Sequence, residues 1–342
     1  MAFIVFTGDI NLTDNAFDIG FGVGSSLQNG LIHPFAMLKK QTHDVWVGNF
    51  EGVVADVSNR ARYTRNVFRI SPEVLEKCGG FIDYWGVANN HVMEHGAEAY
   101  LQMNRILSVQ GKGTFGSDDN RTIVFETCGK EIAISGYSLR VEEKSKNPLY
   151  WHLPEWEDIQ EEVKKISGTD YKVAYIHWGV EYVDHPSVDQ IKHAHWLVDI
   201  GYDLVIGMHP HVLQGYEVYK GKHIFYSLGN TVFNMNHKPS RYGALVGLDV
   251  ETGKVCYHYI WINNSYCPEI VDEKNVPEQY RFSSLNIKVN KELNIEKYTK
   301  EFAIGLKAFR KSNYKDVFRN VFKFRLSIFV QIMRDFVKRK IS

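Results

Sequence analysis

The chain has 342 residues, of which 44% are hydrophobic and 13% aromatic, and its formal net charge is zero. This composition supports a hydrophobic core and excludes disorder as the default interpretation. A net charge of zero gives no overall attraction to nucleic acid. The four cysteines are widely spaced and form no CxxC pair, which argues against a zinc knuckle, a dithiol redox site or a secreted disulfide framework.

The N-terminal sequence MAFIVFTGDI has none of the features of a secretion signal. It lacks a basic segment, a long apolar segment and a small-residue cleavage site. No window of the chain offers the roughly 18 apolar residues that a membrane span needs. We therefore expect a cytoplasmic protein whose chain begins inside its first strand.

Short apolar runs rich in Val, Ile, Phe and Tyr recur along the first three quarters of the chain and predict strands. Several of these runs lack polar alternation, as expected of strands that are covered on both faces. The last two are separated only by residues 251–253, which predicts a hairpin. In chain order the predicted strands are residues 2–7, 45–48, 84–88, 122–126, 131–137, 173–178, 204–207, 223–228, 244–250 and 254–261.

Helical patterns lie between these strands. Ser71 precedes a proline and predicts a capped helix start, and residues 96–109 form a second helical pattern. Ser187 and Gln190 form a capping box before the pattern at residues 191–200. Strands that alternate with helices predict an α/β layered fold.

The pattern changes after residue 262. Residues 263–290 contain Pro268, Pro277 and scattered polar residues, and we interpret them as a connector between a domain at 1–262 and a tail at 291–342. In the tail, aromatic residues recur at helical spacing with basic residues between them, which predicts a basic amphipathic helix or helix pair. Residues 307–340 contain eleven Lys and Arg against two acidic residues, which marks the tail as a separate segment.

Polar side chains follow six of the predicted strands at the point where each strand ends. Because the carboxyl ends of strands in an open α/β sheet share one edge, these side chains are expected to converge in one crevice. They are Asp9 and Asn11 in FTGDIN, Asn49 and Glu51 in VGNFEG, Asn89, Asn90 and His91 in VANNH, His177 and Glu181 in YIHWGVEY, His209 and His211 in VIGMHPH, and Asn230 in YSLGN.

These residue types suit a metal site. Carboxylate, imidazole and amide oxygen atoms bind divalent ions such as Zn, Mn, Fe or Mg. The set is large enough for two ions about 4 Å apart that share one carboxylate. Pro210 predicts an extended segment in which His209 and His211 address two ions, or one ion and a substrate oxygen.

Each of these residues also has a structural interpretation when it is taken alone. Asp9 follows glycine in a common turn sequence, and His177 beside Trp178 is typical of a hydrogen-bonded core histidine. The prediction of a metal site therefore rests on the joint occurrence of the polar clusters after successive strands.

The ordered motifs resemble those of the CapA family, which is named for a protein of poly-γ-glutamate capsule synthesis and resembles the calcineurin-like metallophosphoesterases. The motifs are GDIN, NFE, ANNH, HWGVEY, HPHVLQGYE and YSLGN, with FRISPEVLE at 68–76 and TFGS at 114–117. The resemblance covers roughly residues 1–250. It implies an α/β, layered, metallophosphoesterase-like sandwich of mixed β-sheets flanked by helices, to which this chain adds a C-terminal helical extension.

The resemblance also implies roles for single residues. His91 and Asp9 are the implied catalytic residues, with His91 as proton donor or oxyanion stabiliser and Glu51 as the bridging carboxylate. The cofactor would be divalent metal ions, two in number and either Mn, Fe or Zn, that supply a metal-bound hydroxide. The implied metal ligands are Asp9, Asn11, Glu51, Asn90, His177, His209 and His211. Three positions depart from the usual pattern: Asn11 and Met208 stand where histidine is frequent, and Glu94 where aspartate is usual.

Four further residues are expected to bind substrate. Arg69 in FRISPE offers bidentate hydrogen bonds to an anionic group, with a surface salt bridge as the alternative. Asn89, Glu181 and Asn230 complete this set. Glu181 has two alternatives, as a metal ligand or as a brace for His177.

The expected partner is an anionic small-molecule or polymer substrate. The basic tail suggests peripheral contact with the inner face of an anionic membrane, with packing on the domain or on a second copy as the alternative. Nucleic acid is not expected, because the rest of the chain is acidic and has no nucleic-acid-binding motif. The sequence does not indicate an oligomeric state.

Three functions are compatible with these features. The first is a metal-dependent hydrolase that acts on a phosphoester or related anionic substrate in the biosynthesis of capsule, poly-γ-glutamate or another cell-surface polymer. The second is a non-enzymatic accessory or scaffold protein that binds polymer or synthase. The third is a γ-glutamyl amide hydrolase or transferase, in which the same ions polarise a carbonyl group.

Overall fold

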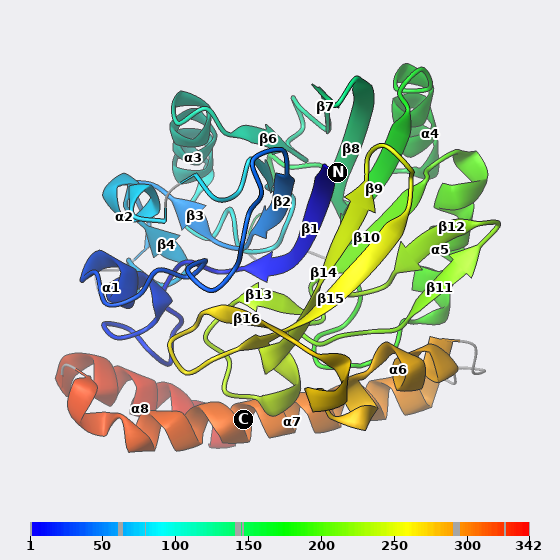
Figure 1. Cartoon of the computed structure of the whole chain (residues 1–342). Coiled ribbons are helices and arrows are strands. Elements are labelled where there is room, and N and C mark those ends of the chain that lie inside the picture. Colours follow the sequence, from blue (N-terminus) through cyan, green and yellow to red (C-terminus); the bar gives the residue numbers. More distant parts are fainter. Residues whose placement is uncertain are drawn as a thin grey trace.

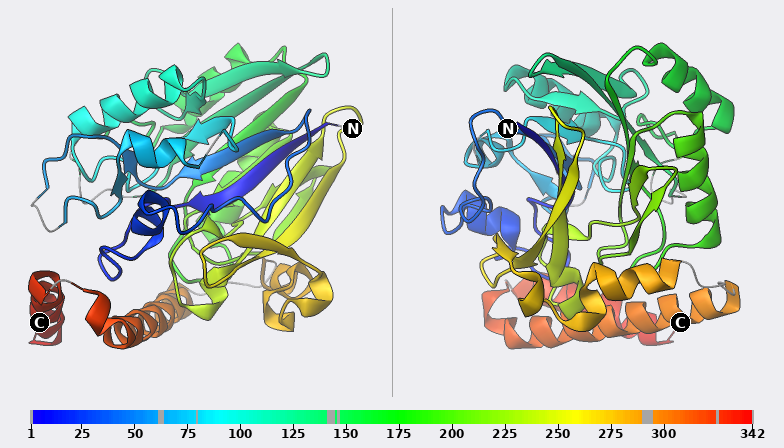
Figure 2. Two further views of the ribbon diagram at one scale, coloured as in Figure 1. Left: turned by 60° about the vertical axis from the view of Figure 1, so that its left-hand side comes forward. Right: turned by 45° about the vertical axis from the view of Figure 1, so that its right-hand side comes forward.

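The computed structural model of the chain describes residues 2–60, 64–78, 80–140, 145, 147–289, 295–324 and 326–341. Two mixed β-sheets pack face to face at its centre, and helices cover their outer faces (Figure 1). The C-terminal helices lie along one edge of this assembly in both views of Figure 2. The predicted fold class, an α/β sandwich of mixed sheets flanked by helices with a C-terminal helical extension, is confirmed.

The first sheet holds the N-terminal strand. Its strands are β1 (Phe3–Ile10), β2 (Val45–Phe50), β5 (Tyr84–Gly86), β6 (Gly113–Phe115), β13 (Asn230–Val232), β14 (Tyr242–Asp249), β15 (Val255–Ile262) and β16 (Pro268–Val271). They are ordered β16-β15-β14-β1-β2-β5-β6, with β13 paired to β1. β1, β2, β5 and β6 run parallel, and the antiparallel pair β14 and β15 confirms the predicted hairpin.

The second sheet is built mainly from the middle of the chain. Its strands are β7 (Thr122–Thr127), β8 (Lys130–Ser138), β9 (Tyr171–His177), β10 (Leu204–Met208), β11 (Tyr216–Tyr219) and β12 (Lys222–Phe225). They are ordered β11-β12-β10-β9-β8-β7, and β8, β9, β10 and β12 run parallel. A small separate sheet pairs β3 (Val53–Val54) with β4 (Arg69–Ile70).

Helices close the two outer faces. The helices α1 (Val23–Gln28), α2 (Pro72–Glu76) and α3 (Ala97–Val109) share a hydrophobic core with the first sheet. The helices α4 (Trp156–Lys165) and α5 (Val188–Ile200) share one with the second sheet. Between the sheets, Phe6 and Val47 of the first pack with Val173, Tyr175 and Ile206 of the second. Burial of this apolar surface holds the layers together.

The ten apolar runs that predicted strands all contain strands, with ends that differ by a few residues. The capping box of α5 is also present: Gln190 N donates to Ser187 Oγ at 3.1 Å and Ser187 N donates to Gln190 Oε1 at 3.0 Å. The predicted cap at Ser71 is wrong in one respect, because its side chain makes no capping hydrogen bond to α2. Its hydroxyl is engaged by the Glu73 side chain instead.

Residues 263–290, interpreted from the sequence as a connector, contain regular structure. β16 extends the first sheet at its edge, and α6 (Phe282–Val289) buries Phe282 and Leu285 in the core between the sheets. Pro268 stands at the first position of an edge strand, where its missing N–H leaves no ladder hydrogen bond unmade. The short 3-10 helices in the C-terminal third are η1 (Lys238–Arg241), η2 (Glu273–Asn275), η3 (Glu278–Tyr280) and η4 (Val321–Lys323).

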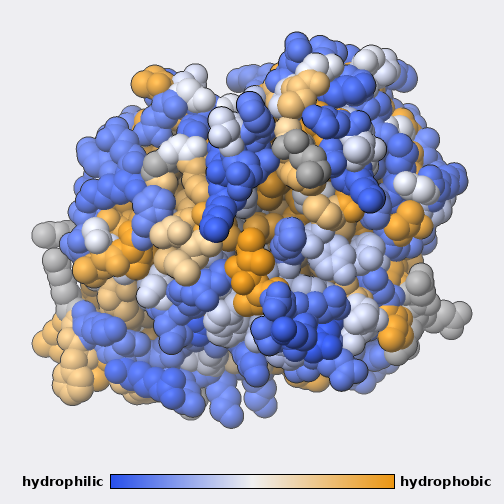
Figure 3. All heavy atoms as spheres, in the orientation of Figure 1, coloured by the Kyte–Doolittle hydropathy of each residue, from blue (hydrophilic) through white to orange (hydrophobic). Residues whose placement is uncertain are grey.

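The tail forms two long helices, α7 (Ile295–Arg319) and α8 (Leu326–Ile341). The aromatic side of α7 packs on the domain: the Phe309 ring stacks on Tyr182 at 4.5 Å, and Tyr314 meets Phe17 edge to face at 5.8 Å. Figure 3 shows hydrophobic residues gathered at its lower left, over the tail. Phe322 is 99% exposed and Leu326 77% exposed. Contact of this surface with an anionic membrane stays a prediction.

In the described ranges, no helix has both the length and the apolar character that crossing a bilayer requires.

Gly305 marks the closest approach of α7 to the domain. A Cβ atom at this position would lie 2.7 Å from Tyr182 Cβ and 2.9 Å from the Tyr182 carbonyl oxygen. We expect Gly305→Val to separate α7 from Tyr182 and to lower the free energy of unfolding by about 1–3 kcal/mol. Limited proteolysis and urea unfolding would measure both effects. Ala303→Val on the exposed side of the same helix is the matched control, and equal behaviour of the two variants would contradict this packing.

Candidate metal centre

The centre forms where parallel strands of both sheets end. In the first sheet, Asp9 at the end of β1 is in register with Asn49 on one side and Asn230 on the other. In the second sheet, His177 at the end of β9 is in register with Met208, which immediately precedes His209. The strand ends therefore carry their polar side chains to one place, as the sequence pattern predicts.

A glycine permits the close approach that this convergence needs. A Cβ atom at Gly8 would lie only 1.9 Å from the Gly229 carbonyl oxygen. Asp9 N donates to the same oxygen at 3.0 Å. The SLGN turn therefore lies directly against the end of β1, and a side chain at position 8 would push Asp9 away from Asn230.

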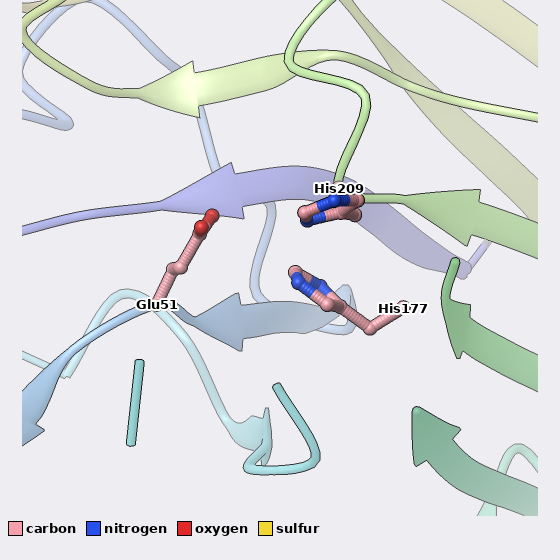
Figure 4. A group of neighbouring side chains, drawn as sticks. All are labelled: Glu51, His177 and His209. Carbon is pink, nitrogen blue, oxygen red and sulfur yellow. The ribbon is translucent and has the colours of Figure 1, made fainter. Parts of the chain in front are cut away.

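Three overlapping groups of side chains have the spacing of metal ligands. In each group the potential ligand atoms lie within 4.8 Å of one another. Glu51, His177 and His209 form the first group, and Figure 4 shows the carboxylate of Glu51 and the two rings turned toward one another. The other groups are Asp9, Glu51 and His211, and Glu181, His209 and His211. Glu51 belongs both to the group with His177 and His209 and to the group with Asp9 and His211, as expected of a carboxylate shared between two metal positions.

Two of these residues carry buried polar atoms that lack a hydrogen-bond partner among the described residues. They are both carboxylate oxygens of Glu51 and both ring nitrogens of His209, and each of the two side chains is 0% exposed. A buried polar group without a partner costs roughly 1–3 kcal/mol, and more when it is charged. Such atoms are retained in a native structure when a further ligand satisfies them.

Asp9 is held in a fixed orientation. Its Oδ1 accepts from Asn49 Nδ2 at 2.8 Å, and its Oδ2 accepts from the His209 backbone N–H at 3.0 Å. His211 Nδ1 lies 3.3 Å from the same Oδ2. Burial acts to raise the pKa of Asp9, but the hydrogen bond and the charge of His211 lower it below its ordinary value. Asp9 is therefore an anion that points into the group.

The protonation of the histidines also suits cation binding. Burial lowers the pKa of His177 to about 3 and the pKa of His209 well below its ordinary value, so both rings are neutral and their nitrogens can act as ligands. Burial acts to lower the pKa of His211 too, but the carboxylates of Glu51 and Asp9 raise it to about 10. Burial and the charge of Asp9 raise the pKa of Glu51 well above its ordinary value.

These observations fit one or more divalent cations. Three carboxylates and three imidazoles form the donor set, and the side chains of Glu51 and His209 have no hydrogen-bond partner among the described residues. A cation would satisfy the unpaired atoms and replace the proton on His211.

His91 stands at the edge of this group and is braced from its far side. Its Nε2 lies 3.5 Å from Glu51 Oε1, and its Nδ1 lies 2.5 Å from Glu94 Oε1. Glu94 in turn accepts from Arg60 at 2.6 Å, and the Phe68 ring stacks on the imidazole at 3.8 Å. The ring plane and the Nδ1 partner of His91 are thus both determined by neighbouring side chains.

The amide side chains form a layer behind the ligands. Asn49, whose role the sequence did not reveal, donates to Asp9 and accepts from Asn89 Nδ2 at 3.0 Å. Asn90 Oδ1 lies 2.9 Å from His177 Nε2, and Asn230 Oδ1 lies 2.9 Å from His211 Nδ1. These contacts orient the ligands, which is the usual function of hydrogen-bonding groups behind a metal site. Asn49 opens the NFE motif, and its position at the end of a strand was the available signal for it.

Two residues of the predicted set are engaged elsewhere. Asn11 Oδ1 accepts from Thr13 N at 2.8 Å and from Thr13 Oγ1 at 2.6 Å. Arg69 donates to backbone oxygens of Arg65 and Ala55 and to Asn66 Oδ1. Arg69 lines a separate cavity of about 150 Å³, so the structure does not bring it to the metal centre.

The backbone conformation at His209 and His211 differs from the extended one predicted from the sequence. The φ angle is 97° at His209 and 57° at His211, so the prediction of an extended segment around Pro210 is wrong. Residues other than glycine adopt positive φ rarely and at an energetic cost. The bend is supported from outside, because Tyr182 N donates to the Pro210 carbonyl oxygen at 2.8 Å.

A cavity of about 560 Å³ opens beside the centre. His91, Glu181 and His211 line its inner end. Its other walls include Arg241 and, from the tail, Asn313 and Lys323. Sequence reasoning missed these three residues because they belong to none of the strand-end motifs.

Comparisons with known proteins agree with the motifs. The capsule biosynthesis protein CapA of Bacillus anthracis is 31% identical over 222 residues, which cover 58% of this chain and 53% of that protein. The PGA biosynthesis protein CapA of Bacillus subtilis is 31% identical over 221 residues, which cover 59% of this chain and 57% of that protein. The chain thus spans about half the length of the curated relatives it matches.

Among solved structures, a phosphatase from Mycoplasma pneumoniae overlaps with 80% of this chain and 95% of its own, at 15% identity and a TM-score of 0.46. This partial overlap does not define an activity. The profile of the family described as "Bacterial capsule synthesis protein PGA_cap" matches residues 3–235, which is more than half of the chain and includes every predicted metal ligand. The resemblance found in the sequence is therefore confirmed, and the chain belongs to the PGA_cap family of bacterial capsule synthesis proteins.

Proposed function

We propose that this protein is a metal-dependent hydrolase that cleaves a phosphoester or a related anionic bond in the synthesis of a poly-γ-glutamate capsule or another cell-surface polymer. The observation that carries the proposal is that two buried side chains without hydrogen-bond partners among the described residues, Glu51 and His209, face each other among further candidate ligands. The biosynthetic setting is supported by family membership and by the names of the two relatives.

The residues that would hold divalent ions are Asp9, Glu51, His177, His209 and His211, with Glu181 at the cavity side. When bound, such ions polarise a phosphoryl oxygen and make a water molecule acidic enough to act as a nucleophile near neutral pH. Two ions are the number we propose, since Glu51 belongs to two ligand groups and would be available to both. Mn, Fe and Zn are all compatible with this mixture of oxygen and nitrogen ligands.

The chain's own groups supply the remaining parts of the reaction. His91 lines the cavity and presents Nε2 toward Glu51. Glu94 Oε1 accepts a hydrogen bond from Nδ1 of His91. The other ring nitrogen, Nε2, is therefore the atom that gives or holds a proton at the leaving group. Asn49 and the His209 backbone N–H keep Asp9 pointed at the ligand group, so that it does not have to reorganise during the reaction.

The role of Glu94 gives a direct test of this assignment. We expect Glu94→Gln to lower kcat by roughly 10- to 100-fold with little change in metal content, because the amide no longer fixes the Nδ1 proton of His91. Steady-state kinetics with elemental analysis would measure both. Glu98→Gln, an exposed position on α3, is the matched control. An unchanged kcat, or a parallel loss of metal, would contradict the proposed role.

The proposal as a whole is tested by metal content and turnover together. Wild-type protein would be compared with the Asp9→Ala/His209→Ala variant by elemental analysis and by hydrolysis of a panel of phosphomonoesters and phosphodiesters. Protein that neither holds nor takes up Mn, Fe or Zn would overturn the hydrolase proposal and leave the accessory or scaffold function. Metal binding without phosphoester hydrolysis, but with cleavage of γ-glutamyl chains, would favour the amide-bond alternative.

A further inference from the structure

The cavity beside the metal centre is larger than a single phosphoryl group needs. Its volume of about 560 Å³ lies in the range typical of sites for whole small molecules. Only its inner end meets the candidate ligands Glu181 and His211 and the neighbouring His91. The outer part must therefore accommodate some other portion of whatever binds at the centre.

The tail forms one wall of this outer part. Asn313 on α7 lines the cavity, and its side chain is 7% exposed. In the part of the chain that the structure describes, no hydrogen bond engages the Asn313 amide group. Phe309, one turn earlier on α7, stacks on Tyr182. Because Tyr182 directly follows Glu181, this contact fixes the position of α7 beside the metal centre. A buried and unpartnered amide beside an open cavity is suited to a hydrogen bond with a ligand.

Two cations stand in the same outer wall. Arg241 donates through Nε to the Ile262 carbonyl oxygen at 2.8 Å, and its guanidinium group lies 4.4 Å from the Trp261 ring centroid. Lys323 Nζ lies 5.4 Å from the Phe21 ring centroid. Among the described residues, no carboxylate lies within 4.0 Å of either cation. A guanidinium group fixed on an aromatic face, with its remaining N–H groups unused, is suited to bind a carboxylate or phosphate.

The acidic residues of the cavity do not neutralise these cations directly. Asp18 accepts from Asn15 N at 2.5 Å and from the Asn234 side chain. Asp316 is hydrogen-bonded by Asn236, and its charge acts on Arg241 without a direct ion pair between them. Burial raises the pKa of both carboxyl groups above their ordinary values.

We propose that the outer part of the cavity is a second subsite, in which Arg241, Lys323 and Asn313 bind a second anionic group of an elongated substrate. The first anionic group of that substrate lies at the metal centre, so the inference rests on the proposed function. The substrate class is thus a chain with at least two anionic groups, one at the reacting end and one farther along. The tail, which lies outside the residues matched by the family profile, selects this class.

The test uses two series of ligands that cannot be hydrolysed. Phosphonates that carry a carboxylate at the far end of an alkyl chain would be compared with alkylphosphonates of the same chain length, by isothermal titration calorimetry on the Mn²⁺-loaded full chain. At one chain length we expect the carboxylate to improve affinity by about tenfold or more, as for a charge-assisted hydrogen bond. Arg241→Ala/Lys323→Ala should abolish this preference.

Two further variants keep the result interpretable. Lys323→Glu changes only an exposed side chain and should also lower the preference without disturbing the fold. Lys311→Ala/Lys315→Ala removes exposed cations from α7 and should leave the preference intact. Equal affinity of the two series at every chain length, or a preference that survives Arg241→Ala/Lys323→Ala, would overturn the inference.

The inference and the hydrolase proposal fail in different ways. A preference that depends on Arg241 and Lys323, in a protein that binds no metal and cleaves no phosphoester, would retain the subsite and discard the hydrolase. Metal-dependent hydrolysis without any preference for the second anionic group would retain the hydrolase and discard the subsite.

Discussion

The Asp9→Ala/His209→Ala variant is expected to lose about two equivalents of bound divalent metal and roughly a thousandfold or more of turnover, with its fold intact. Asp9 is the oriented carboxylate of one ligand group, and His209 is shared by the other two. The double substitution therefore removes a ligand from every group. The fold should persist because neither side chain belongs to the hydrophobic cores that join the layers.

The control for this variant changes the same residue types far from the centre. His258→Ala/Asp272→Ala removes an exposed histidine and an exposed aspartate and should change neither metal content nor turnover. Circular dichroism and thermal unfolding would verify that both variants are folded. If the Asp9/His209 variant retained the metal content of the wild type, the assignment of the centre would be wrong.

Glu51→Gln is expected to stabilise the metal-free protein while it removes the stabilisation that metal brings. Glu51 is 0% exposed, and neither of its oxygens has a described hydrogen-bond partner. His91 and His211 lie 3.5 and 3.6 Å from Glu51 Oε1, but burial and the charge of Asp9 outweigh their attraction. Replacing this charge by a neutral group of the same shape is therefore expected to raise the free energy of unfolding by roughly 1–4 kcal/mol. Residues at functional sites often reduce stability in this way, because the ligand compensates only when it is bound.

The pH dependence of this effect follows from the direction of the pKa shift. Burial and the charge of Asp9 raise the pKa of Glu51 in the folded protein well above its ordinary value, whereas in the unfolded chain it is about 4.3. The folded state therefore binds this proton more tightly, and wild-type stability falls as pH rises above the unfolded pKa. Glutamine has no such proton, so the advantage of Glu51→Gln should be larger at pH 8 than at pH 4.

Urea unfolding in the presence of a chelator, at both pH values, would measure this difference. Glu98→Gln is the matched control, since its side chain is exposed on α3. On addition of Mn²⁺ the order should reverse, with the wild type more stable than Glu51→Gln. A metal-free Glu51→Gln protein that is less stable than the wild type at pH 8 would show that Glu51 has a structural role instead.

Much of the centre could be predicted from local sequence. Asp9, Glu51, His177, His209 and His211 each follow a recognisable apolar run, and the carboxyl ends of parallel strands meet at one edge. The structure brings these five side chains into overlapping groups. The second sheet contributes His177 and His209 to these groups because β9 and β10 are also parallel strands with polar residues at their ends.

Other features depended on contacts that no local pattern reports. The sequence around Pro210 favours an extended chain, yet His209 and His211 adopt positive φ angles. Two residues that are remote in sequence support that bend: Asp9 Oδ2 accepts from the His209 N–H, and Tyr182 N donates to the Pro210 carbonyl oxygen. Arg69 shows the opposite case: its motif suggested substrate binding, but nearby backbone oxygens take up its guanidinium group.

The amino-acid sequence by itself determined the layered α/β class, the order of the main strands along the chain and the residue types of the candidate ligand set, because hydrophobic periodicity and strand-end position are local properties of a chain. Only the tertiary structure decided the surroundings of that set. It placed Asn49 behind Asp9, Asn90 against His177, and α7 along the cavity. Such contacts join residues far apart in the chain, and their strength depends on burial and distance, which exist only once the layers have packed.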